Sequence, residues 1–201
     1  MKLQAIVMFL MVITIVASSC AGVSLEPTIP PDVVDQLKGS LGYALAPHYL
    51  PEGFQFARYD KSMMINIGTP VFYLAYSSPI EGHHIVISYP EAFYPEGNPM
   101  FKFLGISLQR PSDAISEVRV NGKTAYLIRG FWSKDTIEKM IPTGNYSAAK
   151  WDYDFYLSLH FKYDINASEA IGVTIMASNY APQWMTTEEM VRIAESIGHV
   201  N

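Results

Sequence analysis

Residues 151–163, WDYDFYLSLHFKY, alternate between two kinds of side chain. The odd-numbered positions are all aromatic or aliphatic, whereas the even-numbered positions are mostly polar. Successive side chains of a β-strand point to opposite faces of a sheet. The pattern therefore predicts a long strand in a sheet that is buried on one face only, as antiparallel sheets often are. On this pattern Trp151, Phe155 and Leu159 are buried together, and Asp152 and Asp154 are exposed.

Further apolar or alternating segments predict additional strands on both sides of this one. They cover residues 54–59, 71–77, 85–89 and 172–178. Residues 118–125, VRVNGKTA, predict a hairpin, because Asn121-Gly122 tolerates the positive φ angles of a type I′ turn. A two-residue turn at this place pairs Val120 with Lys123.

Two helices are predicted at the ends of this strand-rich region. Residues 32–46 carry apolar side chains at helical spacing, and Pro47 ends that helix. Near the C-terminus, Thr186 and Glu189 form a capping box before an apolar stripe, and Gly198 stands where a C-terminal cap belongs. The order helix, antiparallel strands, helix predicts an α+β fold. We expect a twisted antiparallel sheet with an N-terminal and a C-terminal helix packed on one face.

Composition and charge restrict the class of protein. The chain has 201 residues, of which 49% are hydrophobic and 16% are charged, as expected for a globular domain with a substantial core. Its formal net charge is −5. An acidic domain is repelled by the phosphate backbone, so nucleic acid is not an expected partner.

The N-terminus has the features of an export signal. Lys2 precedes an apolar run over residues 5–17, which is too short to cross a hydrocarbon core of about 30 Å as a helix. The small residues that end in Cys20 resemble the lipobox of prokaryotic lipoproteins. That resemblance implies a diacylglycerol group on Cys20 and cleavage just before it. The alternative is an ordinary signal peptide that is cleaved near Ala21 or Gly22.

These features divide the chain into three parts. We expect a lipoprotein signal peptide over residues 1–19, a lipid anchor and tether over 20–31, and a single domain over 32–201. The tether is small, polar and rich in proline, which suits a spacer between membrane and domain. Cys20 is the single cysteine, so the exported domain cannot depend on an internal disulfide.

Several segments together resemble a domain of unknown function that exported and membrane-tethered prokaryotic proteins carry. The matching segments are residues 49–54 (YLPEGF), 73–76, the hairpin at 118–125, and 188–197 (EEMVRIAESI). This family is distantly similar to lipoprotein-carrier and periplasmic sigma-factor-regulator domains. The resemblance implies a curved sheet that cradles a lipid or senses a partner, and it brings no catalytic motif.

The sequence assigns no catalytic residue, metal ligand or cofactor. His83 and His84 are adjacent, so on a strand they point to opposite faces and cannot hold one ion together. Asp152, Asp154 and His160 share one strand face, where neighbours two residues apart lie about 6.5–7 Å from each other. That spacing suits an acid and a base. A solvated outer face produces the same pattern.

Two segments are too rich in proline and glycine, or too interrupted, for regular structure: residues 90–104 and 133–150. Long loops in a compact domain are frequently binding loops. Alternatively, their aromatic side chains simply fill the ends of the sheet. The candidate ligand-lining residues in and beside these loops are Tyr94, Phe101, Trp132 and Met140.

These observations favour a membrane-anchored lipoprotein that faces the periplasm or the cell exterior. Its expected role is the non-enzymatic binding or sensing of an apolar ligand, such as a lipid, or of a protein partner. Two alternatives remain open: an extracytoplasmic hydrolase whose site is not visible in the sequence, and a structural envelope protein.

Overall fold

The computed structural model describes residues 29–63, 70–91, 101–103, 106–108, 111–133, 135–136, 149–178 and 180–201. The export segment with Cys20, and the candidates Tyr94 and Met140, lie outside the described residues. The helices are α2 (Pro31–Leu41) and α3 (Thr187–Glu195), and two 3₁₀ turns are η1 (Ser112–Ala114) and η3 (Ala181–Gln183). The strands are β1 (Leu45–Pro47), β2 (Gln55–Met63), β3 (Pro70–Ser77), β4 (His84–Glu91), β5 (Phe101–Phe103), β6 (Ile106–Leu108), β7 (Ile115–Val120), β8 (Lys123–Trp132), β9 (Trp151–Asp164), β10 (Ala170–Ala177) and β11 (Ile197–His199).

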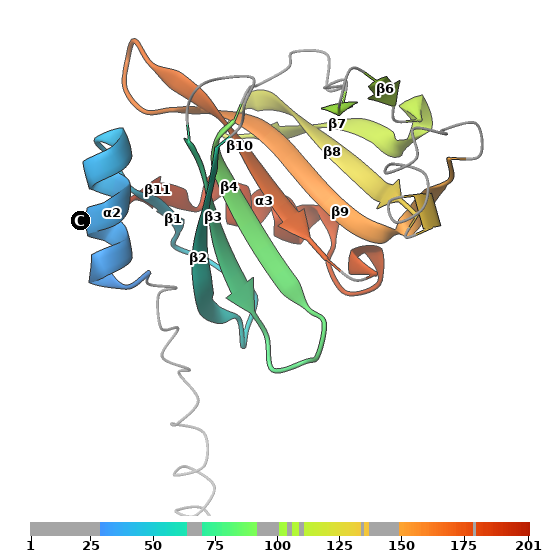
Figure 1. The fold of residues 1–201 in the computed structure, drawn as a ribbon, viewed down its shortest axis with the longest axis horizontal. Helices are drawn as coiled ribbons and strands as arrows, with labels where there is room; N and C mark the ends of the chain where they lie inside the picture. Colours follow the sequence, from blue (N-terminus) through green and yellow to red (C-terminus); the bar gives the residue numbers. More distant parts are fainter. Residues whose placement is uncertain are drawn as a thin grey trace, which may run out of the picture.

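A seven-stranded sheet dominates the structure (Figure 1). Its strand order is β2-β3-β4-β10-β9-β8-β7, and every neighbouring pair is antiparallel. Strand β10 lies between β4 and β9, so it joins the meander β2-β3-β4 to the meander β7-β8-β9. The predicted antiparallel sheet is confirmed.

The predicted hairpin is also confirmed. Asn121 and Gly122 have φ angles of 49° and 77°, and Val120 pairs with Lys123 across the turn. Both turn residues therefore occupy the left-handed region, which asparagine and glycine enter at low cost.

One face of the sheet carries the hydrophobic core. The paired positions across its central strands are apolar and buried: Phe72, Leu74, Ile87, Ile175, Leu159 and Leu127. The apolar stripes of α2 and α3 belong to the same cluster. The buried hydroxyl of Tyr89 donates to the carbonyl oxygen of Leu45 at 2.7 Å and accepts from its N–H at 3.0 Å, which ties β1 to the sheet.

The predicted α+β class, with two helices packed on one face of the sheet, is wrong: the structure is mostly β, and its described part has a seven-stranded antiparallel sheet and two α-helices. The helices are short, with 11 residues in α2 and 9 in α3. The first predicted helix was too long, because Gly42 ends it in the left-handed conformation with φ 83°. The residues that follow form β1, which pairs with β11.

The second helix begins as the sequence predicts and ends differently. The Thr186 side chain accepts a hydrogen bond from the N–H of Glu189 at 3.1 Å. The C-terminal cap is Ser196 rather than Gly198, which lies inside β11. Gly198 therefore takes part in the pairing of β11 with β1 and does not cap the helix.

Strand β9 is much longer than helix α3, so α3 covers only part of it. A strand of 14 residues is about 46 Å long, whereas a helix of 9 residues is about 14 Å long. Figure 1 shows β8 and β9 extending well past α3. Leu159 is fully buried, but Trp151 and Phe155 are only half-buried, and Tyr153 is 37% exposed. The predicted common burial of Trp151, Phe155 and Leu159 is therefore wrong. Asp154 is exposed as predicted, whereas Asp152 is half-buried.

Because α3 covers only part of β9, substitutions at different positions on the same strand face should change the free energy of unfolding by different amounts. Leu159→Ala should lower the free energy of unfolding by about 2–5 kcal/mol, because it empties a buried core site. Tyr153→Ala should leave that free energy nearly unchanged. Urea denaturation of both variants measures the difference, and equal destabilisation would mean that the whole strand face is covered.

Candidate functional site

The end of β8 and β9 that neither described α-helix covers carries a group of aromatic side chains, which we call the aromatic surface. Its members are Trp151, Tyr153 and Phe155 on one face of β9, Phe131 and Tyr156 on the other face, and Tyr180 beside Phe155. Each is half-buried or exposed, and Tyr180 just before η3 is 54% exposed. Core aromatics of the sheet, such as Phe72, are fully buried by contrast.

These rings contact one another. Phe155 packs edge to face on Tyr156, with ring centroids 4.3 Å apart, and Tyr156 packs on Phe131 at 5.3 Å. Phe155 also lies 6.3 Å from Tyr180, whose backbone N–H donates to the carbonyl oxygen of Phe155 at 2.8 Å. Such contacts limit the rotation of the rings, so the surface is held in place before any ligand arrives.

A bulge in β8 shapes this end of the sheet. The pairing register of β8 with β9 shifts between Arg129 and Phe131. Gly130 at the shift has φ 97°, and a Cβ atom there would overlap the carbonyl oxygen of Asp152 and the indole Nε1 of Trp151. Only glycine fits this position, and a bulge re-aims the side chains around it.

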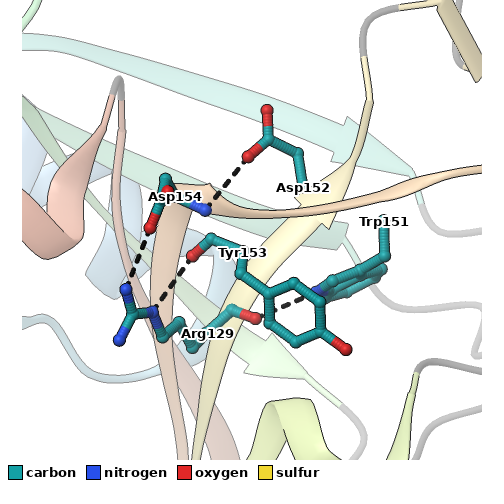
Figure 2. Close-up of polar contacts among 5 residues, drawn as sticks. All are labelled: Arg129, Trp151, Asp152, Tyr153 and Asp154. Carbon is teal, nitrogen blue, oxygen red and sulfur yellow. Dashed lines mark hydrogen bonds and ion pairs between the residues drawn. The ribbon is translucent and has the colours of Figure 1, made fainter.

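Polar contacts fix the backbone below the rings (Figure 2). The guanidinium of Arg129 donates from Nη2 to Asp154 Oδ1 at 2.9 Å and from Nε to the carbonyl oxygen of Tyr153 at 3.2 Å. The indole Nε1 of Trp151 donates to the carbonyl oxygen of Arg129 at 3.0 Å, and the N–H of Asp154 donates to Asp152 Oδ1 at 3.0 Å. The bulge and the start of β9 therefore form one hydrogen-bonded unit.

Tyr153 stands outside this unit with its own partner. Its hydroxyl donates to the carboxylate of Asp113 in η1, with oxygen–oxygen distances of 2.9 and 3.0 Å. This hydrogen bond raises the pKa of Tyr153 above its ordinary value, so the hydroxyl keeps its proton at neutral pH. The ring is thus oriented while one side of it stays open to solvent.

The structure separates the residues that the sequence grouped. Trp132 is buried and packs edge to face on its cross-strand partner Trp151 at 5.2 Å, so it supports the aromatic surface from the neighbouring strand. Phe101 lies in β5, and its side chain is outside the description. His160 is six residues from Asp154 on β9, about 20 Å away. The shared strand face therefore does not bring His160 together with Asp152 and Asp154, as a solvated outer face would also have it.

His160 instead belongs to a polar row on the other face of the sheet. Strand pairing aligns seven polar residues, one from each strand: Asp60, Tyr73, Ser88, Thr174, His160, Tyr126 and Glu117. Ser88 and Thr174 at its centre are buried. Alternation alone could have shown that His160 is on this face, but the strand order was needed to find its neighbours.

Glu91 joins the centre of this row. A register shift between β10 and β4 brings its carboxylate beside Ser88, whose hydroxyl donates to Glu91 Oε1. Thr174 Oγ1 donates to Glu91 Oε2 at 2.6 Å and lies 2.9 Å from His160 Nδ1. Because a hydroxyl has one proton, Thr174 must accept from His160, which places a proton on Nδ1. The chain Glu91–Thr174–His160 therefore fixes the protonation of the imidazole.

The described residues hold no group of three or more His, Cys, Asp or Glu side chains that could bind a metal ion. His83 and His84 have separate surroundings. The ring of His83 stacks on Trp184 at 4.3 Å, whereas His84 Nδ1 lies 2.9 Å from Ser77 Oγ. None of the described helices is long and apolar enough to cross a membrane.

A pocket of about 470 Å³ lies at the opposite end of β9 from the aromatic surface. Its walls come from the end of α2, the turn between β9 and β10, and the residues around β11. They include Lys38, Leu41, Tyr43, Ile165, Glu169 and His199. Burial and the nearby charge of Glu169 raise the pKa of Tyr43 to about 12. Sequence reasoning did not find this pocket, because its parts are far apart in the chain.

Comparisons with known proteins give a distant structural likeness. No family model matches the sequence, and no curated protein matches it. Two solved structures of MucB are similar: the MucA/MucB complex of Pseudomonas aeruginosa, at 12% identity and a TM-score of 0.39, and MucB in complex with MucA(peri), at 11% and 0.36. Each match covers 79% of this chain but only 35% and 37% of those chains.

The polar chain on the second face makes a stability prediction. Thr174→Val keeps the shape of the side chain but leaves the Glu91 carboxylate and His160 Nδ1 without their shared hydroxyl. Buried polar groups that lose a partner cost about 1–3 kcal/mol, so the free energy of unfolding should fall by that amount. Thr124→Val on β8, where the half-buried side chain has no hydrogen bond in the described structure, is the control. Equal urea midpoints for the Thr174→Val and Thr124→Val variants would contradict the hydrogen-bonded series Glu91–Thr174–His160.

Proposed function

We propose that this protein is an exported, non-enzymatic binding protein, anchored to the membrane through a lipid on Cys20, that binds an extended peptide segment of a protein partner. The aromatic surface supports this proposal. It is a preformed group of half-exposed rings on the part of β9 that no described helix covers. The proposal rests on this surface and not on the likeness to MucB.

The composition of the surface is that of a protein-binding site. Tyrosine, tryptophan and arginine are enriched among residues that dominate binding energy at protein interfaces. Here Trp151 and Tyr153 lie beside Arg129, within a unit that hydrogen bonds already hold in place. Preorganised side chains lose little conformational entropy on binding, so their contact area contributes more to affinity.

The spacing of the rings favours an extended segment. Trp151, Tyr153 and Phe155 alternate along β9, so their attachment points are about 6.6–6.8 Å apart. Alternate side chains of an extended peptide have the same spacing, so apolar side chains of a partner can match successive rings. The carboxylate of Asp113, which accepts from the Tyr153 hydroxyl, borders these rings and favours a segment that also carries Lys or Arg.

The enzymatic alternative has weaker support. Asp154 is paired with Arg129, and the carboxylate of Asp152 accepts from the backbone of Asp154. The ring of His160 points its Nε2 into a buried position, so a dissolved substrate does not reach that atom. A general base must come within hydrogen-bond reach of its substrate. His160 Nε2 does not meet that requirement, and Asp154 is held by Arg129.

The anchor is tested on the protein from its host membrane. Mass spectrometry should show an N-terminal cysteine that carries acyl chains, because the small residues before Cys20 match a lipobox. Cys20→Ala should release the domain from the membrane fraction or stall its processing. A soluble chain that begins after Cys20 would refute the anchor and leave the binding surface untouched.

The binding surface is tested with a displayed library of random short peptides. Selection on the wild-type chain should enrich sequences that alternate apolar residues and contain Lys or Arg. Tyr153→Ala should weaken the selected peptides about tenfold or more, the range for an important interface aromatic.

The matched control is Ile80→Ala in the turn between β3 and β4, where Ile80 is a large apolar side chain that is 62% exposed. This variant should bind the selected peptides like the wild type. No enrichment, or enriched peptides that bind Tyr153→Ala as tightly as the wild type, would overturn the proposed surface. That result would favour a structural envelope role.

A further inference from the structure

The pocket beside α2 contains two opposite charges that do not neutralise each other. Lys38 and Glu169 both line it. Within the described chain no ion pair joins them, and neither has another ion-pair partner. Glu169 accepts only a long hydrogen bond from the Asn166 amide, at 3.4 Å, among the side-chain contacts of the described residues. Both side chains are exposed, so their charged ends can contact a small molecule in the pocket.

The remaining walls divide into a polar and an apolar part. The half-buried Tyr43 ring packs edge to face on His199, at 6.4 Å between centroids, and it stacks on Tyr89 at the same distance. The Tyr43 hydroxyl keeps its proton at neutral pH, so it is a hydrogen-bond donor. Leu41 and Ile165 supply apolar surface.

The pocket also includes the C-terminal turn of α2, with Leu41 and the cap residue Gly42. The C-terminal end of a helix carries partial negative charge, which attracts a cation. Together with Glu169 it provides an environment for an ammonium group. Lys38 provides donors for a carboxylate.

We infer that this pocket binds a small zwitterion with an apolar group, of the class of the α-amino acids. Its volume of about 470 Å³ lies in the range of small-molecule sites. The ligand's carboxylate binds Lys38, its ammonium binds Glu169, and its apolar group packs on Leu41 and Ile165. The site is separated from the aromatic surface by the length of β9, so the two binding activities are independent.

The test uses L-leucine and two analogues that each lack one charge, added to the full chain in detergent. 4-Methylpentanoate lacks the ammonium group, and isopentylamine lacks the carboxylate. L-Leucine should bind about fivefold more tightly than either analogue, the effect of one partly exposed charge contact. Calorimetry gives the affinities, and amide NMR shifts should be confined to residues around Gly42, Ile165 and His199.

Two variants assign the charges. Lys38→Met should abolish the preference for L-leucine over isopentylamine and keep the preference over 4-methylpentanoate. Glu169→Gln should do the reverse. Asp35→Asn, at an exposed position of α2 outside the pocket, should change neither preference. Circular dichroism checks that each variant is folded.

Three outcomes would overturn the inference: no binding of L-leucine at about 10 mM, equal affinity for the three probes, or amide shifts outside the pocket. Equal loss of both preferences in both variants would also contradict the assigned roles. None of these outcomes bears on the proposed peptide binding at the aromatic surface, because that binding is tested separately with the Tyr153→Ala variant.

Discussion

The 14-residue strand β9 packs against α3, a helix of only 9 residues, and this mismatch in length determines which part of the strand lies in the core. The second half of β9 lies in the core, where Leu159 and Phe161 are buried. The first half continues with the same alternation of aromatic side chains but has no described helix above it. Apolar burial stabilises a fold in proportion to the area removed from water, so the uncovered half contributes little to stability. Its rings are available for binding instead.

The remaining structure keeps that exposed half ordered. Its backbone is paired with β8, and the bulge at Gly130 locks Arg129, Trp151 and Asp154 into one hydrogen-bonded unit. Exposed aromatic side chains on a mobile loop would lose conformational entropy on binding, whereas these are already held on a sheet. The partly buried chain of Glu91, Thr174 and His160 ties the neighbouring strands β4, β10 and β9 together on the other face. The sheet is thus braced on both sides of the strand that carries the surface.

Much of the local structure was predictable from particular residues. The alternation in residues 151–163 identified β9, Asn121-Gly122 identified the hairpin, and Thr186 with Glu189 identified the start of α3. The fold class was not predictable in the same way, because local pattern does not show how far a helix extends over a sheet. Gly42 ended α2 early, and the residues after it became a strand by pairing with β11.

The sites were less predictable than the strands, because they depend on which strands are neighbours. Trp132 was chosen as a lining residue but is buried beside Trp151, its partner across the strands. His160 was grouped with Asp154 on its own strand, but its partners come from β10 and β4. The pocket combines Lys38 with Glu169, which are 131 residues apart in the sequence. Sequence alternation assigns a face, whereas only the tertiary structure assigns neighbours.

Hydroxyl-radical footprinting of β9 tests most directly whether this strand is covered along only half of its length. Mass spectrometry would compare the modification rates of Trp151, Tyr153 and Phe155 with that of Phe161 on the same strand face. We predict rapid modification of the first three side chains, with Tyr153 foremost, and strong protection of Phe161. Uniform protection of all four side chains would show that the aromatic surface is part of the core, and it would contradict our account of the fold and of its binding site.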